Sequence, residues 1–295
     1  MRIALATCRS LPDWEKDDLP LDAALRRLGA EVLQPAWDEP GFDWAGVDGC
    51  LIRTTWDYME RREAYVAWAE RVEGVTRLFN PAAVVRWNTR KTYLRDLESQ
   101  GVPIAATVWL ERGDAVDVAA LMAERGWRRG FLKPVVGATA RETLRFDADL
   151  EGLAAAQAHL DRTLRREAMI VQPYLERVET EGELSAVFVD GDLTHAVRKI
   201  PVPGDYRVQD DFGASDERVE LPPQEKALAE FVVGRVARFG FAPLLYARAD
   251  FLRDDRGELV LTELELVEPS LFFRHHAAAA ERLAVALCRR LRGDP

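Results

Sequence analysis

The chain has 295 residues, of which 48% are hydrophobic and 31% are charged, and its formal net charge at pH 7 is −10. This composition is typical of a globular protein with several cores and excludes a disordered chain. The acidic balance argues against nucleic acid or an anionic membrane as the main partner, and no apolar run reaches transmembrane length. Three scattered cysteines without metal-ligand spacing indicate a reducing compartment, so we expect a cytoplasmic protein.

The first part of the chain alternates short apolar runs with amphipathic segments. Strands are expected at 3–7, 31–34 and 47–52, and helices at 21–28 and from about 60 to 73. This alternation favours a parallel α/β sheet, which binds ligands beyond the carboxyl ends of its strands. Four polar or aromatic side chains follow the third strand at that edge: Arg53, Trp56, Asp57 and Tyr58. A capped loop with one aromatic anchor would explain them equally well taken alone, but their concentration favours a substrate site.

A lysine follows two helix-capping residues in the next segment. Asn88 and Thr89 can cap a helix, which we expect to run through Gln100. Lys91 would then lie in the first turn, where the helix dipole disfavours a cation. An exposed surface lysine is the usual explanation for such a position.

A second lysine ends a short apolar strand. Lys133 stands between Leu132 and Pro134, which limits its freedom, and a point cation at this place suits the phosphates of a nucleotide. Gly137 is the one glycine of the loop that follows, so backbone amides of other residues would have to contact the phosphates. Neither the P-loop nor the Rossmann glycine fingerprint is present in the chain.

Strands alternate with polar loops over the following residues. We expect a helix at 150–166 and strands at 169–175, 183–189 and 194–200, with a hairpin turn at Asp190-Gly191. Arg198 lies in the last of these strands, where a solvated surface charge and a substrate contact are equally favoured. Arg207 lies in the loop-rich stretch beyond it, and for this residue we prefer a functional role.

The stretch from 246 to 273 is the most informative of the chain. It reads as two extended segments joined by a turn, and period two places Arg248 and Asp250 on one face of the first segment and Glu263 and Glu265 on one face of the second. If the segments pair, three carboxylates share one surface, which suits Mg²⁺ bound to a nucleoside triphosphate. Without a metal, at least one carboxyl should have a raised pKa. The alternative is a half-solvated hairpin with an acidic outer face.

This stretch resembles the metal-binding end of the ATP-grasp ligases, in which an Arg-x-Asp strand precedes a Glu-x-Asn strand and a proline turn. The resemblance implies that Asp250, Glu263 and Glu265 are metal ligands and that Arg248 holds the transferred phosphate. Glu265 stands where many members of the family have Asn, so the charge balance at the metal differs here.

Further positions resemble the nucleotide site of the same family. The resemblance implies phosphate contacts by Lys91 and Lys133, and adenine contacts by the hinge residues Gln172, Pro173, Tyr174 and Leu175. It implies a ribose contact by Glu179 or Glu183, of which we favour Glu183 because it begins a strand. Arg207 resembles an arginine that binds the substrate carboxylate or the transferred phosphate.

Within the family, the segments 51–58, 171–188, 195–201 and 263–273 are most similar to the subgroup of D-cycloserine-forming cyclo-ligases, which act on O-ureido-D-serine. They are more distantly similar to prokaryotic glutathione synthetase and D-alanine–D-alanine ligase. The resemblance implies an α/β ATP-grasp fold, with two α+β lobes that grip ATP, preceded by a Rossmann-like domain. The expected parts are the N-terminal domain at 1–80, the central or lid subdomain at 81–170 and the catalytic subdomain at 171–295.

The implied activity is ligation of a carboxylate to an amine, or ring closure, on a small amino-acid-like or peptide-like substrate. It would use ATP and Mg²⁺ (or Mn²⁺) and pass through an acyl phosphate, with charge neutralisation as the main catalytic effect. Two alternatives remain: a nucleotide-binding module without turnover, given the glycine-poor loop, and a metal-dependent phosphohydrolase. We expect small-molecule partners and neither nucleic acid nor membrane, and a homodimer is left open.

Overall fold

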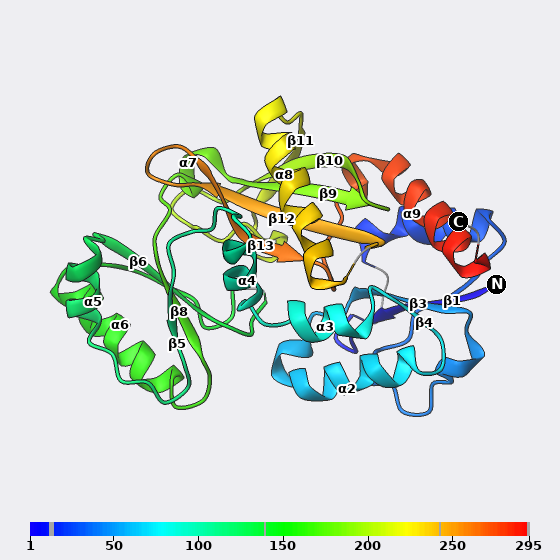
Figure 1. Ribbon diagram of the computed structural model, residues 1–295, viewed down its shortest axis with the longest axis horizontal. Coiled ribbons are helices and arrows are strands. Elements are labelled where there is room, and N and C mark those ends of the chain that lie inside the picture. Colours follow the sequence, from blue (N-terminus) through cyan, green and yellow to red (C-terminus); the bar gives the residue numbers. More distant parts are fainter. Residues whose placement is uncertain (12–14, 139, 242, 294–295) are drawn as a thin grey trace.

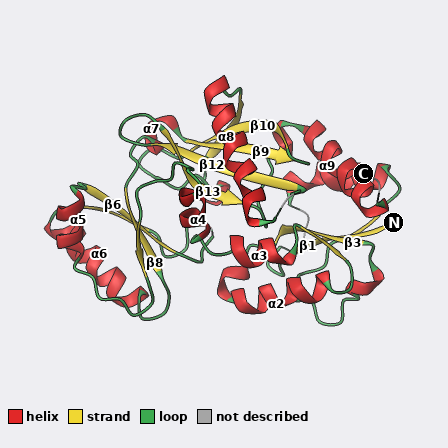
Figure 2. Cartoon of the chain, in the orientation of Figure 1, coloured by secondary structure: helices red, strands yellow, loops and turns green. Residues whose placement is uncertain are grey.

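The computed structural model describes residues 1–11, 15–138, 140–241 and 243–293. Over these residues the strands form three sheets, each built from a successive part of the chain. Figure 1 shows the first sheet on the right in blue, the second on the left in green, and the third between them at the top. The secondary structure is mixed α and β throughout, as predicted (Figure 2).

The N-terminal sheet is parallel, with strand order β2-β1-β3-β4. Its strands are β1 (Arg2–Thr7), β2 (Glu31–Leu33), β3 (Gly49–Thr54) and β4 (Arg77–Phe79). Side chains alternate along β1, so Ile3 and Leu5 pack on one face while Ala4 and Ala6 pack on the other. The helices of the first face are α1 (Leu19–Arg27) and α9 (Ala277–Arg292), and those of the second are α2 (Arg62–Glu73) and α3 (Ala82–Asn88). Helices on both faces confirm the predicted parallel α/β arrangement.

The middle sheet is antiparallel and forms the lobe farthest from the termini (Figure 1). Its order is β5-β8-β6-β7, and its strands are β5 (Val108–Leu110), β6 (Arg129–Pro134), β7 (Leu144–Asp147) and β8 (Met169–Pro173). Two helices, α5 (Val118–Arg125) and α6 (Leu150–Thr163), cover one side and form a separate core with it. The opposite side faces the rest of the molecule, so β6 and β8 present Lys133 and the hinge to the cavity described below.

The third sheet is antiparallel, with order β11-β10-β9-β12-β13. Its strands are β9 (Glu183–Val189), β10 (Asp192–Ile200), β11 (Ser215–Val219), β12 (Tyr246–Arg253) and β13 (Leu259–Glu265). Helices α4 (Tyr93–Ser99) and α8 (Pro223–Arg235) pack on one face, and the short α7 (Val178–Glu181) precedes β9. The register sets Arg248 opposite Glu265 and Asp250 opposite Glu263, which confirms the predicted pairing.

The helix predicted from Asn88 through Gln100 is wrong in its first half. Helix α3 ends at Asn88, and α4 begins only at Tyr93. The Asn88 side chain does not cap a helix: its Nδ2 donates to the Leu264 carbonyl oxygen at 2.7 Å, and its Oδ1 accepts from the Leu266 amide at 2.8 Å. A long-range pair with the edge strand β13 thus replaces the local cap.

The last helix returns to the first part of the chain. Helix α9 packs against α1 on the N-terminal sheet, and Arg27 pairs with Glu281 at 3.0 Å. Residues beyond 276 therefore share a core with residues 1–80, although the predicted division placed them with the catalytic subdomain. The boundaries at 80 and 170 stay predictions.

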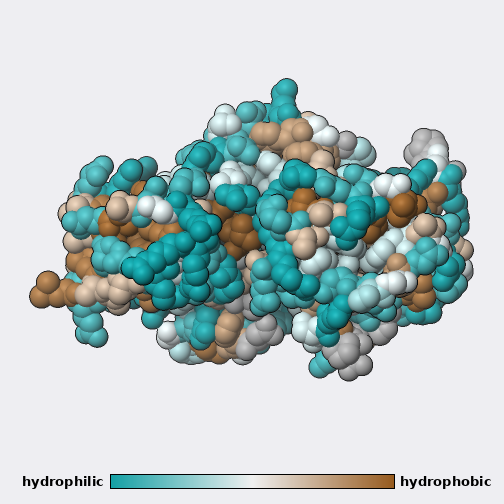
Figure 3. All heavy atoms as spheres, turned by 90° about the horizontal axis from the view of Figure 1, so that it is seen from below, coloured by the Kyte–Doolittle hydropathy of each residue, from teal (hydrophilic) through white to brown (hydrophobic). Residues whose placement is uncertain are grey.

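The described part of the chain holds no helix that is long and apolar enough to cross a membrane. Figure 3 shows one face of the molecule, on which hydrophobic residues lie in small groups among more numerous hydrophilic ones. That face therefore offers small apolar contacts rather than one broad apolar surface.

Candidate active site

One cavity of about 320 Å³ lies where the three sheets meet. Its size falls at the lower end of the range usual for small-molecule sites. The predicted site residues that line it are Trp56, Tyr58, Lys91, Lys133, Gln172, Pro173, Tyr174, Leu175, Glu183, Arg207, Arg248, Asp250, Glu263 and Glu265. The predicted residues that do not line it are Arg53, Asp57, Glu179 and Arg198. Residues distant in the sequence are thus brought to one place.

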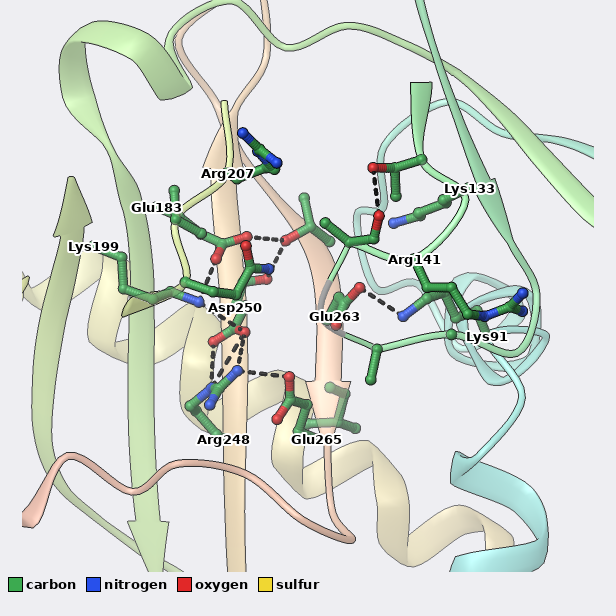
Figure 4. A pocket seen from close by; sticks show the side chains of 18 of the residues that line it. Lys91, Lys133, Arg141, Glu183, Lys199, Arg207, Arg248, Asp250, Glu263 and Glu265 are labelled. Carbon is green, nitrogen blue, oxygen red and sulfur yellow. Dashed lines mark hydrogen bonds and ion pairs between the residues drawn. The ribbon is translucent and has the colours of Figure 1, made fainter. Parts of the chain in front are cut away.

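The acidic face of the β12–β13 hairpin is interleaved with cations. The Arg248 Nη2 atom lies 2.8 Å from Asp250 Oδ2 and 2.6 Å from Glu265 Oε1. Asp250 also accepts a hydrogen bond from the Ser185 hydroxyl at 2.6 Å and pairs with Lys199 at 3.2 Å. Figure 4 shows Asp250 enclosed between Arg248 and Lys199. Side-chain cations therefore supply the charge balance that the sequence analysis assigned to a metal.

The pKa values of these carboxyls diverge. Burial alone would raise the pKa of Asp250, but Arg248 and Lys199 hold it well below its ordinary value. Burial raises the pKa of Glu265 to about 7, and the neighbouring Asp250 and Glu263 add to this effect although Arg248 opposes it. The prediction of at least one raised carboxyl pKa is confirmed, but burial is the largest cause and repulsion by the neighbouring carboxylates only adds to it.

The two lysines differ in how their charge is balanced. Lys91 lies in the turn between α3 and α4, and its Nζ pairs with Glu263 Oε1 at 2.6 Å. Lys133 is 6% exposed and has no ion-pair partner among the described residues. Burial lowers its pKa to about 8, with only partial compensation from Glu263. Lys133 is therefore a buried cation able to accept an anionic ligand (Figure 4).

The hinge after β8 forms another wall of the cavity. Gln172 donates from Nε2 to the Thr107 hydroxyl at 2.8 Å, which fixes its amide. The Tyr174 hydroxyl donates to Glu179 at 2.6 Å, and Glu179 also pairs with Arg145 at 2.9 Å, away from the cavity. Of the two carboxylates predicted as ribose ligands, Glu183 is the one that lines the cavity.

Of the four N-terminal residues predicted to bind substrate, two line the cavity and two do not. Arg53 is 2% exposed, pairs with Asp18 at 2.7 Å and donates to the Pro269 carbonyl oxygen at 3.1 Å. It lies below the cavity surface because β3 is buried on both faces. Asp57 accepts from Trp37 Nε1 at 2.7 Å instead of facing the cavity. Trp56 and Tyr58 do line it, so the aromatic members and not the charged ones reach the site.

Lys199 lines the cavity, although the residue predicted from the sequence was its neighbour Arg198. The Arg198 side chain is 47% exposed and lies 3.8 Å from Glu217 on the outer face. Lys199 is 7% exposed and pairs with Glu183 and Asp250. The pairing of β9 with β10 shifts by one residue between 193 and 195, so that Lys199 stands opposite Glu183. A simple two-residue hairpin would have set Arg198 there, and nothing in the sequence marks the bulge.

Two loops meet above the cavity. Arg207 pairs with Asp205 at 2.6 Å, and its neighbour Tyr206 shares a hydrogen bond of 2.9 Å with the Thr143 hydroxyl. The glycine-poor loop contains Ala140 and Glu142 at φ values of 54° and 52°, a conformation that favours glycine. Thr139 lies outside the described residues. The two loops are therefore connected directly by side chains.

Ion pairs hold the glycine-poor loop on α6 and on the residues that follow this helix. Glu142 accepts from both Nη atoms of Arg162, at 2.9 and 2.8 Å, and Arg141 pairs with Glu167. The Arg162 contact lowers the pKa of Glu142 to about 2 despite the opposing effect of burial. Side-chain anchoring thus offsets the cost of left-handed backbone without glycine.

Among the residues that the structure describes, no group of three His, Cys, Asp or Glu side chains is arranged to hold a metal ion. The metal roles of Asp250, Glu263 and Glu265 stay predictions. The chemistry of the set still fits Mg²⁺, because carboxylate oxygens are its preferred protein ligands and phosphate oxygens can complete its shell. Lys133 fits a phosphate, because it is a buried cation that pairs with no carboxylate in the described part of the chain.

Three sheets meet around one cavity, in which Lys133, without an ion-pair partner among the described residues, lies near a carboxylate-bearing hairpin; this arrangement is that of an ATP-grasp ligase. Residues 114–262 match the family model of the prokaryotic glutathione synthetase ATP-grasp domain, and residues 3–80 match that of the D-cycloserine synthetase DcsG N-terminal domain. The chain belongs to the D-cycloserine synthetase family of ATP-grasp enzymes. It is 34% identical over 292 residues to the cycloserine biosynthesis protein DcsG of Streptomyces lavendulae, covering 96% of each chain.

Solved structures agree with this assignment. The crystal structure of D-cycloserine synthetase DcsG is similar with a TM-score of 0.86 and 32% identity, over 99% of this chain and 100% of that one. D-alanine–D-alanine ligase from Bacillus anthracis, complexed with ATP, has a TM-score of 0.70 at 15% identity, over 99% and 98% of the two chains, and shares the fold.

The family membership confirms the predicted activity. The protein is an ATP- and Mg²⁺-dependent ligase that forms C–N bonds on small amino-acid-like substrates with release of ADP. This result favours the ligase over the two alternatives, a nucleotide-binding module without turnover and a phosphohydrolase.

Proposed function

We propose that this protein closes a ring within one serine-derived amino acid, in the manner of a D-cycloserine synthetase. The observation that carries the proposal is the similarity to D-cycloserine synthetases over nearly the whole chain, including the N-terminal part that supplies Trp56 and Tyr58 to the cavity. The cavity of about 320 Å³ is within the size range of small-molecule sites.

In this proposal the carboxylate of the substrate attacks the γ-phosphorus of ATP, so that ADP leaves and an acyl phosphate forms. A nitrogen of the same substrate molecule then attacks the acyl carbon, and phosphate leaves. No covalent enzyme residue is needed, and catalysis rests on orientation and charge neutralisation. The protein's part is to hold the two reacting ends of one molecule close together.

In the proposed reaction the cavity residues have different roles. Lys91 and Lys133 would bind nucleotide phosphates, and Arg248 would face the transferred phosphoryl group, where its guanidinium stabilises negative charge. Asp250, Glu263 and Glu265 would hold Mg²⁺, which when bound neutralises charge on the phosphates. Lys199, which pairs with Glu183 and Asp250, would add a further positive charge to this group from β10.

At the other end of the nucleotide, the hinge from Gln172 to Leu175 would meet the adenine. Leu175 would donate the backbone hydrogen bond, since Pro173 has no N–H. Glu183 would accept from the ribose hydroxyls, and Arg207 would contact the substrate carboxylate or the transferred phosphate from the loop above. A cytoplasmic location, the absence of nucleic-acid partners and a homodimer stay predictions.

ADP release with single substrates and with pairs of substrates tests the proposal. O-ureido-D-serine alone should support ADP formation, and mass spectrometry should find the cyclic product. Adding further amino acids should not raise the rate. If ADP formed only when a second, separate amine was supplied, the protein would join two molecules and ring closure would be wrong. The control is Lys226→Met, on an exposed helical surface, which should behave like the parent.

A further inference from the structure

Glu268 differs from the other carboxylates of the cavity. Among the described residues, Glu183, Asp250, Glu263 and Glu265 each pair with at least one lysine or arginine. Glu268 lines the same cavity, yet no cationic nitrogen of the described residues lies within ion-pair distance of it. A carboxylate at a cavity wall without a cation is able to bind a cationic group of a ligand.

The surroundings of Glu268 hold it in place without neutralising it. It lies in the bend that follows β13, and its backbone carbonyl accepts from Trp56 Nε1 at 2.9 Å. Pro269 follows it, and the carbonyl of Pro269 accepts from the buried Arg53 at 3.1 Å. These two bonds attach the bend to the N-terminal domain. The position of Glu268 is therefore fixed by backbone contacts, and no lysine or arginine of the described residues forms an ion pair with its side chain.

The charge of Glu268 is costly in the protein without ligand. Burial raises its pKa to about 8, and the nearby Glu265 adds to this effect, although Lys91 and Tyr58 oppose it. Glu15, from the N-terminal domain, lines the cavity as well, and burial also raises its pKa. A bound cation would relieve this unfavourable charge, whereas a second anion would increase it. This end of the cavity therefore suits a positively charged group.

We propose that Glu268, with Trp56 and Tyr58 beside it, forms a subsite for the ammonium group of the amino-acid substrate. The carboxylate would accept the ammonium hydrogen bonds, and the Trp56 ring would add a cation–π contact. Tyr58, whose ring stacks on Tyr65, would form part of the wall. The inference rests on the proposed function, because it assumes a substrate that carries a free amine.

The subsite also orients the substrate. Lys133, Arg248 and Lys199 line the same cavity as Glu268, and Arg248 donates to the Ser270 carbonyl oxygen at 3.0 Å, two residues from Glu268. In the proposed function these cations bind the phosphates and the substrate carboxylate. An amino acid bound with its ammonium on Glu268 turns its carboxylate towards these cations, because the two ends of the molecule carry opposite charges. Glu268 is thus a specificity residue that sets the direction of binding rather than a group that takes part in bond formation.

Two probes and matched variants test the subsite by calorimetric titration with Mg²⁺ and the non-hydrolysable analogue AMPPNP present. The probes are O-ureido-D-serine and its N-acetyl derivative, which lacks the positive charge. The parent should bind the free amine more tightly. Glu268→Gln should weaken the free amine about ten- to a hundredfold and leave the N-acetyl derivative nearly unchanged. Glu268→Asp, which keeps the charge, should restore part of the difference.

The controls separate the subsite from a structural role. Glu220→Gln, at a side chain that is 92% exposed, should bind both probes like the parent. AMPPNP affinity should be unchanged in Glu268→Gln, and the melting temperature should not fall, since Gln keeps the shape of the side chain and removes a costly buried charge. If the parent and Glu268→Gln discriminate between the probes equally, the subsite is wrong while the proposed function stands. If the parent binds neither probe, the proposed substrate is wrong and the subsite with it.

Discussion

Replacing Lys133 by methionine should have opposite effects on nucleotide binding and on stability. Lys133 is 6% exposed, ends strand β6 and has no anionic partner among the described residues. Methionine has a similar length and no charge, so the change removes the cation without leaving a large cavity. Loss of a charge-assisted contact should weaken ATP binding about ten- to a hundredfold.

The stability effect follows from the pKa. Burial lowers the pKa of Lys133 from 10.5 to about 8. A difference of this size corresponds to about 3 kcal/mol that disfavours the charged form in the folded protein. Below pH 8 the lysine is charged in both the folded and the unfolded state, so the full penalty lowers stability. The penalty decreases as the pH rises from 8 towards 10.5, because the folded protein loses this proton first.

Nucleotide-free Lys133→Met protein should therefore unfold at a higher temperature than the parent at pH 7, with a gain of up to about 3 kcal/mol. This gain should fade at alkaline pH. Calorimetric titration measures ATP affinity, and thermal unfolding from pH 7 to pH 10 measures the stability. The exposed control Lys226→Met should change neither property. Parental ATP affinity in Lys133→Met would remove Lys133 from the phosphate site, and a loss of stability at pH 7 would refute the reasoning about its buried charge.

Three further changes give distinct outcomes. Glu263→Gln, which removes the charge paired with Lys91, should lower the kcat for ADP release by about a hundredfold or more while ATP affinity stays within a few fold; parental turnover would contradict its role. Arg53→Ala leaves the buried Asp18 unpaired and should lower the free energy of unfolding by about 3–5 kcal/mol, whereas a changed KM with parental stability would argue for direct substrate contact. Ala140→Gly, at a φ of 54°, should raise stability by about 1 kcal/mol in thermal unfolding. The control Ala154→Gly, exposed within α6, should lower stability by a similar amount, and the same sign at both positions would refute the backbone argument.

Short-range features of the chain were predictable because neighbouring residues alone decide them. The turn at 254–257 and the period of two on either side of it specify the β12–β13 hairpin. The register that sets Asp250 opposite Glu263 also requires a one-residue shift between Asp250 and Phe251, which the turn does not specify. The parallel N-terminal sheet follows in the same way from alternating strands and helices. Lys133 could be predicted as a site residue because its position at the end of a strand and before a proline limits its freedom, and both features are visible in the local sequence.

Features that depend on distant partners required the tertiary structure. Asn88 has the side chain of a helix cap, but it pairs with Leu264 on β13 and with Leu266 directly after it, 176 and 178 residues away, and the helix begins later. Arg53 follows a strand at the predicted binding edge, yet Asp18 pairs with it below the cavity surface. In both cases the residue type agreed with the local prediction, but the side chain pairs with a residue that is distant in the sequence.

The charged residues of the cavity also show which features the sequence determines and which depend on the fold. The sequence determined that carboxylates and basic residues recur along the chain and that hairpin residues of like charge share a face. Only the fold decided which of them pair. A one-residue shift in the register of β10 turns Lys199 inward and Arg198 outward. The packing of the sheets leaves Lys133 and Glu268 without ion-pair partners among the described residues. The physical reason is that ion pairing and desolvation depend on distances of a few ångströms between residues far apart in sequence, whereas secondary structure depends on neighbours along the chain.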